Sequence, residues 1–307
     1  MLPQLGTVDL GNNMFSCGFP STLTSCRLLT AVRLASNQLR GEISPKIVKM
    51  KSLSFLSLSD NHLTNITSAI RNLLGCKNLS VLILSTNFTN EAIPNDDHIN
   101  FQMDFKVLAL GGCKLTGQIP LNQITGSIPG WYLTAVRLAY NQPQGQISPE
   151  IVMMTPLSFL ALSGNNLSYM TGAVRILTGC KNLIVLILSS NFMNEAMPNY
   201  DLKKISDVLQ NLQAPDCGGC ELIGPFPLWL CNLRKLQVLG LSGNQITGSI
   251  PRCGSGNYRA YSISTCHVTM FLEYFPKELG RLQALQSHED QLNSRYMELP
   301  LYILLTC

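Results

Sequence analysis

The sequence predicts an α/β repeat fold, a solenoid with a parallel sheet on its concave face and short helices, 3-10 turns and loops on its convex side. Three observations predict it. An asparagine returns at a nearly fixed interval, as at Asn37 and Asn61. Apolar residues precede it with the spacing L-x-x-L-x-L, and x-L-x-G-x-I often follows it. Such a recurring pattern indicates stacked repeats, each burying its apolar face against the next.

Each part of the pattern has a physical reason. Leu56 and Leu58 are two residues apart, the period of a strand with one buried face, so Ser57 should point away from the core. The asparagine amide carries donors and an acceptor, which can satisfy backbone groups in the turn that leaves the sheet. The glycine suits the next turn, and the Ile-Pro that often follows ends strand pairing, because proline lacks an N–H. We identify this pattern as a leucine-rich repeat.

The asparagine position, called the ladder position below, can be followed along the chain. Asn13, Asn37 and Asn61 are 24 residues apart, and Asn87 follows after 26. These intervals fall within the roughly 20 to 29 residues of this repeat class. Cysteine is tolerated at this position, so we interpret such cysteines as ladder residues. The predicted ladder residues are Asn13, Asn37, Asn61, Asn87, Cys113, Asn122, Asn141, Asn165, Asn191, Cys220, Asn244 and Cys266.

A block of several repeats is duplicated. Residues 29–95 recur as residues 133–199, so that LTAVRLASNQLRGEISPKIV aligns with LTAVRLAYNQPQGQISPEIV. The interval from Cys113 to Asn122 is too short for a repeat, which predicts an irregular seam near residues 113–133. Pro215 is a second expected weak point, because a proline in a core strand removes a sheet hydrogen bond.

Composition excludes several function classes. The net charge is +4 and charged residues make up 13% of the chain, against roughly 25% in soluble domains, so nothing indicates nucleic acid. The four histidines are dispersed and no catalytic motif is recognisable, so we expect neither an enzyme nor a cofactor.

Three of the 11 cysteines have a spacing that predicts packing, and whether any disulfide forms stays open. Cys26, Cys76 and Cys180 each stand eleven residues before a ladder asparagine, and we expect buried free thiols there. Cys217-x-x-Cys220 invites a zinc or redox interpretation, but it has no second pair or histidine cluster nearby, so we expect no metal.

Four N-x-[ST] sequons favour a secreted glycoprotein. Asn87 is a ladder residue whose amide should be buried, which leaves Asn65, Asn78 and Asn166 as glycosylation candidates. Met1 falls directly in a repeat and no run approaches the roughly 20 apolar residues of a membrane span. We therefore expect no signal peptide and no membrane span in this chain, and a bare apolar face at each end.

Long segments resemble the ectodomains of plant leucine-rich-repeat receptor-like kinases. They include GEISPKIVKMKSLSFLSLSDNHLTNITSAIRNLLGCKNLSVLILSTNFTNEAIP, and FPKELGRLQALQS with RYMELPLYIL. The resemblance is to the tyrosine-sulfated glycopeptide receptors and their relatives, the phytosulfokine receptors. It implies a plant-type convex side, a location at the plasma membrane facing the cell exterior, a tyrosine-sulfated peptide as ligand and a co-receptor ectodomain as partner.

We predict a single repeat array over residues 1–274, since a solenoid grows by addition of repeats. Residues 275–307 resemble the beginning of the island segment that helps such receptors bind their peptide. The membrane helix and the Ser/Thr kinase of the family are missing, and no G-x-G-x-x-G, V-A-I-K, H-R-D or D-F-G pattern occurs. We expect no catalysis and no signalling by this chain alone.

The predicted ligand-binding face consists of the strand residues that point outward on the concave sheet. It is small, polar and sparsely charged, so an extended peptide could lie across it and bond to hydroxyls. Arg33 or Arg137 offers a guanidinium fork to a sulfate or carboxylate. An ordinary solvated sheet face stays the alternative for each residue. The candidates are Arg33, Ser57, Ser59, Asp60, Ser85, Thr86, Arg137, Tyr140, Ser163 and Ser189.

Two functions therefore stay open. One is a binding module that resembles the peptide-hormone-binding part of a plant receptor-like kinase. The other is a non-functional, degenerate fragment or an incomplete gene model of such a receptor, with a purely structural fold. The missing strand at the seam, Pro215 and the bare ends favour the second.

Overall fold

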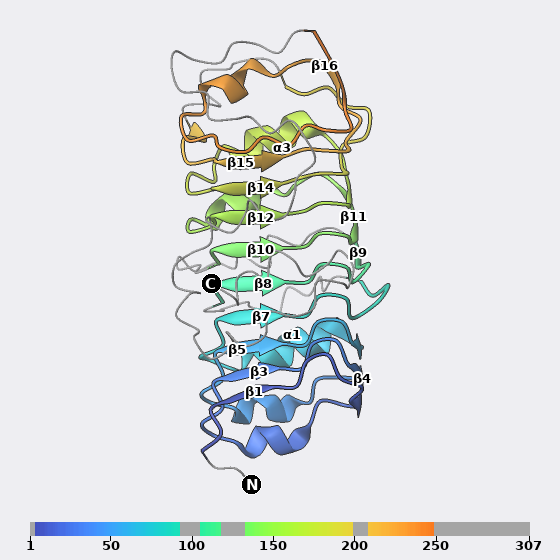
Figure 1. Cartoon of the computed structure of the whole chain (residues 1–307), viewed down its shortest axis with the longest axis vertical. Coiled ribbons are helices and arrows are strands. Elements are labelled where there is room, and N and C mark those ends of the chain that lie inside the picture. Colours follow the sequence, from blue (N-terminus) through green and yellow to red (C-terminus); the bar gives the residue numbers. More distant parts are fainter. Residues whose placement is uncertain (1–3, 93–104, 118–132, 199–207, 249–307) are drawn as a thin grey trace. The chain divides into compact units, whose positions relative to one another are not determined.

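The computed structural model describes the chain except for residues 1–3, 93–104, 118–132, 199–207 and 249–307 (Figure 1). The chain divides into two compact units. Unit 1 comprises Met1–Glu91, Met103–Lys114 and His267–Cys307, and unit 2 comprises Ala92–Gln102 and Leu115–Cys266. Within each unit, every described turn adds one strand to a parallel sheet, so the predicted solenoid is confirmed. The island-like segment and most of the predicted seam lie outside the described residues and stay predictions.

Unit 1 contains a long and a short parallel sheet on two sides of the same turns (Figure 1). The register advances by one repeat per strand, so that Val32 lies opposite Leu56 and Leu56 opposite Leu82. All three side chains are fully buried, as the strand alternation predicts. The long sheet consists of β1 (Thr7–Asp9), β3 (Ala31–Arg33), β5 (Phe55–Ser57), β7 (Val81–Ile83) and β8 (Val107–Ala109), and the short one of β2 (Ser16–Cys17), β4 (Gln38–Gly41) and β6 (His62–Leu63).

Unit 2 repeats this arrangement. Leu160 lies opposite both Val136 and Leu186, again at repeat spacing. The long sheet consists of β10 (Ala135–Arg137), β12 (Phe159–Ala161), β14 (Val185–Ile187) and β15 (Ala214–Asp216). The short sheets consist of β9 (Thr116–Gly117), β11 (Gln142–Gly145) and β13 (Asn166–Leu167), and of β16 (Ile223–Pro225) and β17 (Gln245–Thr247).

The repeat length decides which helix forms on the convex side. Repeats of 24 residues carry a 3-10 helix, whereas the 26-residue repeats that end at Asn87 and Asn191 carry an α-helix. An α-helix rises only about 1.5 Å per residue against about 2.0 Å for a 3-10 helix, so it needs more residues to cross the same side of the turn. The 3-10 helices are η1 (Ser21–Ser25), η2 (Pro45–Lys49), η3 (Pro149–Met153) and η4 (Leu228–Asn232), and the α-helices are α1 (Ile66–Leu74) and α3 (Met170–Leu177).

The ladder asparagines bind each turn to its neighbour. Asn61 donates from Nδ2 to the carbonyls of Leu58 and Ser59 in its own turn and to Leu34 in the preceding turn, each at 3.0 Å. Its Oδ1 accepts the N–H of Leu39, also from the preceding turn, at 2.9 Å. The same arrangement recurs at Asn37, Asn87 and Asn191. The amide therefore satisfies turn backbone as predicted.

Cysteine replaces the amide at two described ladder positions. Cys113 donates from Sγ to the Leu84 carbonyl at 3.6 Å, and Cys220 to that of Leu188 at 3.5 Å. Both thiols are buried and free, so their prediction as ladder residues is confirmed. Burial raises the pKa of the Cys113 thiol to about 11, which keeps it protonated and able to donate at neutral pH.

The prediction of buried free thiols is confirmed at Cys76 and Cys180 and is wrong about burial at Cys26. Cys76 and Cys180 are buried free thiols, and desolvation raises the pKa of each to about 11. Cys26 is free but only half-buried. Cys217 is free and buried, and the described residues contain no metal-ligand cluster. Cys231, in η4, is disulfide-bonded, which the sequence had left undecided.

Asn141 is the first described ladder residue after Cys113, and the assignment of Asn122 as a ladder residue stays a prediction. Asn122 itself lies outside the described residues. Within unit 2, the N–H of Leu115 donates to Asn141 Oδ1 at 3.0 Å, the bond that elsewhere runs to the next ladder amide. Cys113 and Asn141 are 28 residues apart, within the range of the repeat class.

Pro215 weakens the sheet on one side only. Its strand still forms, and Pro215 lies opposite Leu186 of β14. The Pro215 carbonyl faces the following turn, where it accepts the Gly240 N–H at 3.0 Å. In a parallel strand the N–H of a residue points to the same neighbour as its carbonyl, so the N–H that proline lacks would also have faced the following turn. That turn forms no strand beside β15 and pairs with it only through an isolated bridge between Asp216 and Gly240.

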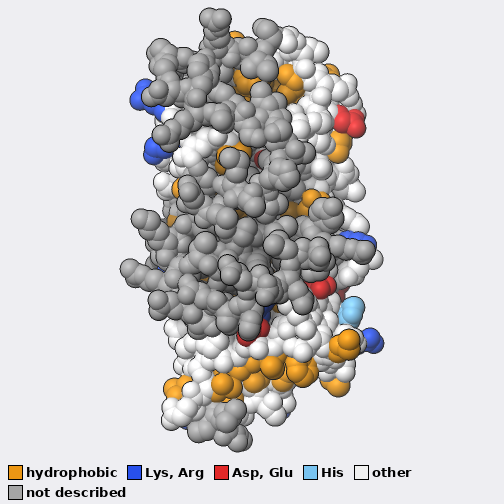
Figure 2. All heavy atoms as spheres, in the orientation of Figure 1, with side chains coloured by type: hydrophobic (Ala, Val, Ile, Leu, Met, Phe, Trp, Pro, Cys, Tyr) orange, Lys and Arg blue, Asp and Glu red, His pale blue; other side chains and the backbone are white. Residues whose placement is uncertain are grey.

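The first turn of unit 1 leaves apolar side chains bare. Figure 2 shows hydrophobic side chains gathered near this end. Leu10, Met14 and Phe15 are exposed, Met14 by 84%. The expected bare face is therefore confirmed here, and the opposite end of the array lies outside the described residues.

A glutamate from the next repeat caps each α-helix. Glu91 accepts the N–H groups of Asn65 and Ile66 at 2.7 Å, one on each carboxylate oxygen. Glu195 accepts those of Tyr169 and Met170 at 2.7 and 2.6 Å in the same way. These N–H groups have no partner within the helix, so the carboxylates satisfy them and complement the positive end of the helix dipole.

We expect Glu195→Gln to lower the free energy of unfolding by about 1–2 kcal/mol, because it replaces a charge-assisted pair of bonds and turns an amide donor toward a backbone donor. Urea unfolding followed by circular dichroism measures it. Glu221→Gln is the control, since its exposed carboxylate makes no hydrogen bond in the described part of the chain. Equal effects of the two changes would contradict the capping role.

We expect Asn61→Ala to lower the free energy of unfolding by about 1–3 kcal/mol, because the Leu39 N–H loses its buried acceptor and three carbonyls lose a donor. Asn61→Cys should cost less, since a thiol donor remains, as at Cys113. Asn13→Ala is the control, because that exposed amide bonds only to Leu10 and Gly11 of its own turn. A loss for Asn13→Ala as large as for Asn61→Ala would show that ladder position alone does not decide the cost.

Candidate functional site

The candidate residues lie on or just after the strands of the two long sheets. Arg33 ends β3 and lies opposite Ser57 of β5, and Arg137 ends β10. Ser59, Asp60, Ser85, Thr86, Tyr140, Ser163 and Ser189 follow their strands, between the last core leucine and the ladder asparagine. The structure therefore brings together Arg33, Ser57, Ser59, Asp60, Ser85 and Thr86 on adjacent turns of unit 1, and Arg137, Tyr140, Ser163 and Ser189 on those of unit 2.

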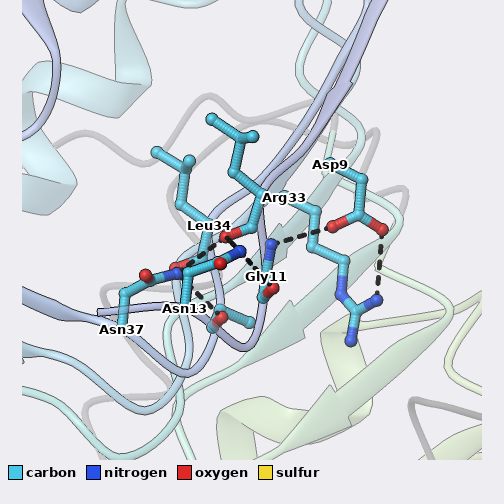
Figure 3. A network of polar contacts seen from close by, with 8 residues as sticks. Asp9, Gly11, Asn13, Arg33, Leu34 and Asn37 are labelled. Carbon is cyan, nitrogen blue, oxygen red and sulfur yellow. Dashed lines mark hydrogen bonds and ion pairs between the residues drawn. The ribbon is translucent and has the colours of Figure 1, made fainter. Parts of the chain in front are cut away.

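Arg33 already has an acidic partner. Its Nη1 lies 3.2 Å from Oδ2 of Asp9, which is opposite it on β1 (Figure 3). The other carboxylate oxygen of Asp9 accepts the N–H of Gly11 at 3.0 Å, which orients the carboxylate. An anionic ligand at Arg33 would therefore compete with Asp9. Asp9 is not among the predicted site residues, although Asp9 and Arg33 are 24 residues apart and so occupy the same repeat position.

The serine hydroxyls on neighbouring turns are buried and lack hydrogen-bond partners. The Oγ atoms of Ser59 and Ser85 have no hydrogen-bond partner. Their turns are adjacent, because the Asp60 N–H donates to the Ser85 carbonyl at 2.9 Å. Each hydroxyl can donate and accept, so the pair suits the alternating donors and acceptors of an extended peptide.

The residue before each ladder position has a left-handed backbone conformation. The φ values run from 53° to 71°. Most of these residues are glycine or carry short polar side chains, which tolerate this region. We call this set the left-handed column: Asn12, Ser36, Asp60, Thr86 and Gly112 in unit 1, and Tyr140, Gly164, Ser190, Gly219 and Gly243 in unit 2.

No described helix is of the length and hydrophobicity that a membrane crossing requires.

Comparison with known sequences identifies the repeat and its relatives. A family model described as Leucine Rich Repeat matches residues 235–256. The chain is 31% identical over 326 residues to Receptor-like protein 35 of Arabidopsis thaliana, covering 82% of this chain and 34% of that protein. It is 47% identical over 70 residues to Phytosulfokine receptor 1 of the same plant, covering 23% of this chain and 7% of the receptor. The chain thus spans a minor part of either relative.

Solved structures share the fold. The TDR receptor superposes with a TM-score of 0.66 at 22% identity, covering 79% of this chain and 40% of the receptor chain. The Arabidopsis receptor kinase HAESA, in complex with the peptide hormone IDA and the co-receptor SERK1, gives 0.60 at 24% identity, covering 80% and 43%. The chain is a non-catalytic leucine-rich-repeat solenoid whose relatives are the receptor-like proteins and phytosulfokine receptors of Arabidopsis thaliana.

Proposed function

We propose that this chain is a peptide-binding module that acts outside the cell at the plasma membrane, and that its ligand is an extended, tyrosine-sulfated peptide lying across the concave sheet. The observation that carries the proposal is the pair of buried hydroxyls without hydrogen-bond partners at Ser59 and Ser85, beside the exposed Asp60 and the half-buried Thr86. Such a face offers hydrogen bonds without large side chains that would block an incoming backbone.

The relatives support the peptide class and a co-receptor partner. One relative is named as a phytosulfokine receptor, and RGFR1, a plant peptide hormone receptor of the same fold, is solved with RGF2. HAESA is solved with both a peptide hormone and a co-receptor. Arg33 and Arg137 are the cations proposed to meet the sulfate. The guanidinium of Arg33 would exchange Asp9 for the ligand, and Arg137, which is buried and has an interaction partner of its own, would have to exchange that partner.

The alternative is a degenerate fragment or incomplete gene model that keeps the fold without a ligand. The interrupted pairing after Pro215 favours it, because a strand is missing from the sheet where the proline lacks a donor. This alternative predicts no specific binding and a gradual, weakly cooperative melt.

Titration calorimetry of the purified chain with a tyrosine-sulfated peptide and its unsulfated twin tests the proposal. We expect tighter binding of the sulfated form, reduced by Arg33→Gln or Arg137→Gln and by added salt, because exposed charge pairs are screened. Lys46→Gln is the control for loss of a positive charge away from the sheet, in η2. Absent or equal binding of the two peptides by a chain that melts cooperatively would overturn the sulfate proposal.

The three glycosylation candidates differ in what their amides do. Asn65 caps α1, with Oδ1 accepting the Ser68 N–H at 3.0 Å and Nδ2 donating to Glu42. Asn78 donates to the Lys51 carbonyl at 2.7 Å. The amide of Asn166 is exposed and makes no hydrogen bond in the described residues. A glycan at Asn166 therefore displaces the least structure.

We expect Asn166 to be the most fully glycosylated sequon when the chain passes through a secretory pathway, and Asn87 to stay unmodified in folded protein. The Asn87 amide is buried, and its Nδ2 donates to the carbonyls of Leu58, Leu84 and Ser85. Mass spectrometry of deglycosylated peptides measures the occupancy, with Asn166→Gln as control. A glycan on Asn87 in folded protein would contradict the ladder geometry.

A further inference from the structure

Tyr140 is the one large residue of the left-handed column. Its φ is 55°, a region that a bulky side chain adopts only at a cost. Phe88 and Phe192 also have positive φ, but their rings are fully buried, so packing offsets the cost. The Tyr140 side chain is 48% exposed and its hydroxyl has no hydrogen-bond partner in the described residues. Packing alone therefore gives a weak reason for a tyrosine here.

The ring of Tyr140 is seated on Gly164. A Cβ atom at Gly164 would lie 2.5 Å from Cδ1 and 2.8 Å from Cε1 of the ring, which is too close for any side chain. The backbone of position 164 does not by itself demand glycine. Asp60, the corresponding residue of the first copy, has nearly the same φ, 53° against 61°. The absent side chain thus makes room for the ring.

The first copy of the duplication shows the arrangement without the ring. At the offset of 104 residues, Ser36 corresponds to Tyr140 and Asp60 to Gly164. The backbone conformation is the same in both copies, with φ of 54° at Ser36. Where the first copy has two short polar residues, Ser36 and Asp60, the second copy therefore has an exposed aromatic residue and a glycine that accommodates its ring.

Resting on the proposed function, we propose that Tyr140 on Gly164 is the specificity-determining platform that stacks against the ring of the ligand's sulfotyrosine. Aromatic rings prefer such offset contacts with one another. The Tyr140 residue is 48% exposed, so its ring can contact an aromatic ring of the ligand, whereas Arg137, three residues earlier in the same turn, is buried and has an interaction partner of its own. Small column residues follow Gly164 along unit 2, namely Ser190 and Gly219.

The test is a double-mutant cycle between the protein and a synthetic peptide. Tyr140→Ser restores the first-copy residue and should weaken binding of a sulfotyrosine peptide roughly three- to tenfold. Tyr140→Phe should bind as wild type. The same peptide with O-sulfoserine keeps the sulfate but lacks the ring, and Tyr140→Ser should not change its affinity.

A second tyrosine provides a matched control. Tyr169, the N-cap residue of α3, is 46% exposed and its ring lies over Gly172, whereas the first copy has Asn65 and Ser68 there. The pair Tyr169→Asn and Gly172→Ser should leave peptide affinity unchanged.

Three results would overturn the inference. The first is equal affinity of Tyr140→Ser and wild type for the sulfotyrosine peptide. The second is an equal loss with the O-sulfoserine peptide. The third is a melting temperature of Tyr140→Ser several degrees below wild type, which would make the ring structural. Failure of wild-type protein to bind either peptide would instead overturn the proposed function itself, and this inference with it.

Discussion

The structure depends on satisfying backbone groups where each strand turns off the sheet. These groups are buried between stacked turns, where water cannot reach them, so each one left unpaired would cost roughly 1–3 kcal/mol. One asparagine amide per turn supplies the bonds, and it reaches both its own turn and the preceding one, as Asn61 does toward Leu34 and Leu39. The ladder therefore ties each turn to the preceding one. A thiol at Cys113 or Cys220 supplies a single weaker donor, and the stack tolerates it at these positions.

The ladder bonds and the buried strand positions recur in successive turns, whereas the convex and concave sides of each turn vary. On the convex side, two additional residues convert a 3-10 helix into an α-helix, and a glutamate from the next repeat then satisfies the exposed N–H groups at its start. On the concave side, only the backbone conformation before the ladder residue is fixed. Side chains there can change without disturbing the core, which is the physical condition for a surface that acquires new ligands.

The duplication compares two side-chain sets on one backbone. Residues that make the frame, such as Asn87 and Asn191 or Glu91 and Glu195, are the same in both copies and make the same bonds. The exposed positions differ, and each tyrosine of the second copy is accompanied by a glycine that accommodates its ring.

The sequence by itself determined the repeat, the ladder residues, the strand alternation and the packing role of Cys76 and Cys180, because these follow from periods of two residues and of one turn. Tertiary structure alone decided the contacts between turns. It placed Asp9 beside Arg33, joined the Leu115 N–H to Asn141, and placed the Tyr140 ring over Gly164. Such contacts join residues about one repeat apart, so they form only when the turns stack on one another. The local sequence pattern does not specify which side chains then come into contact.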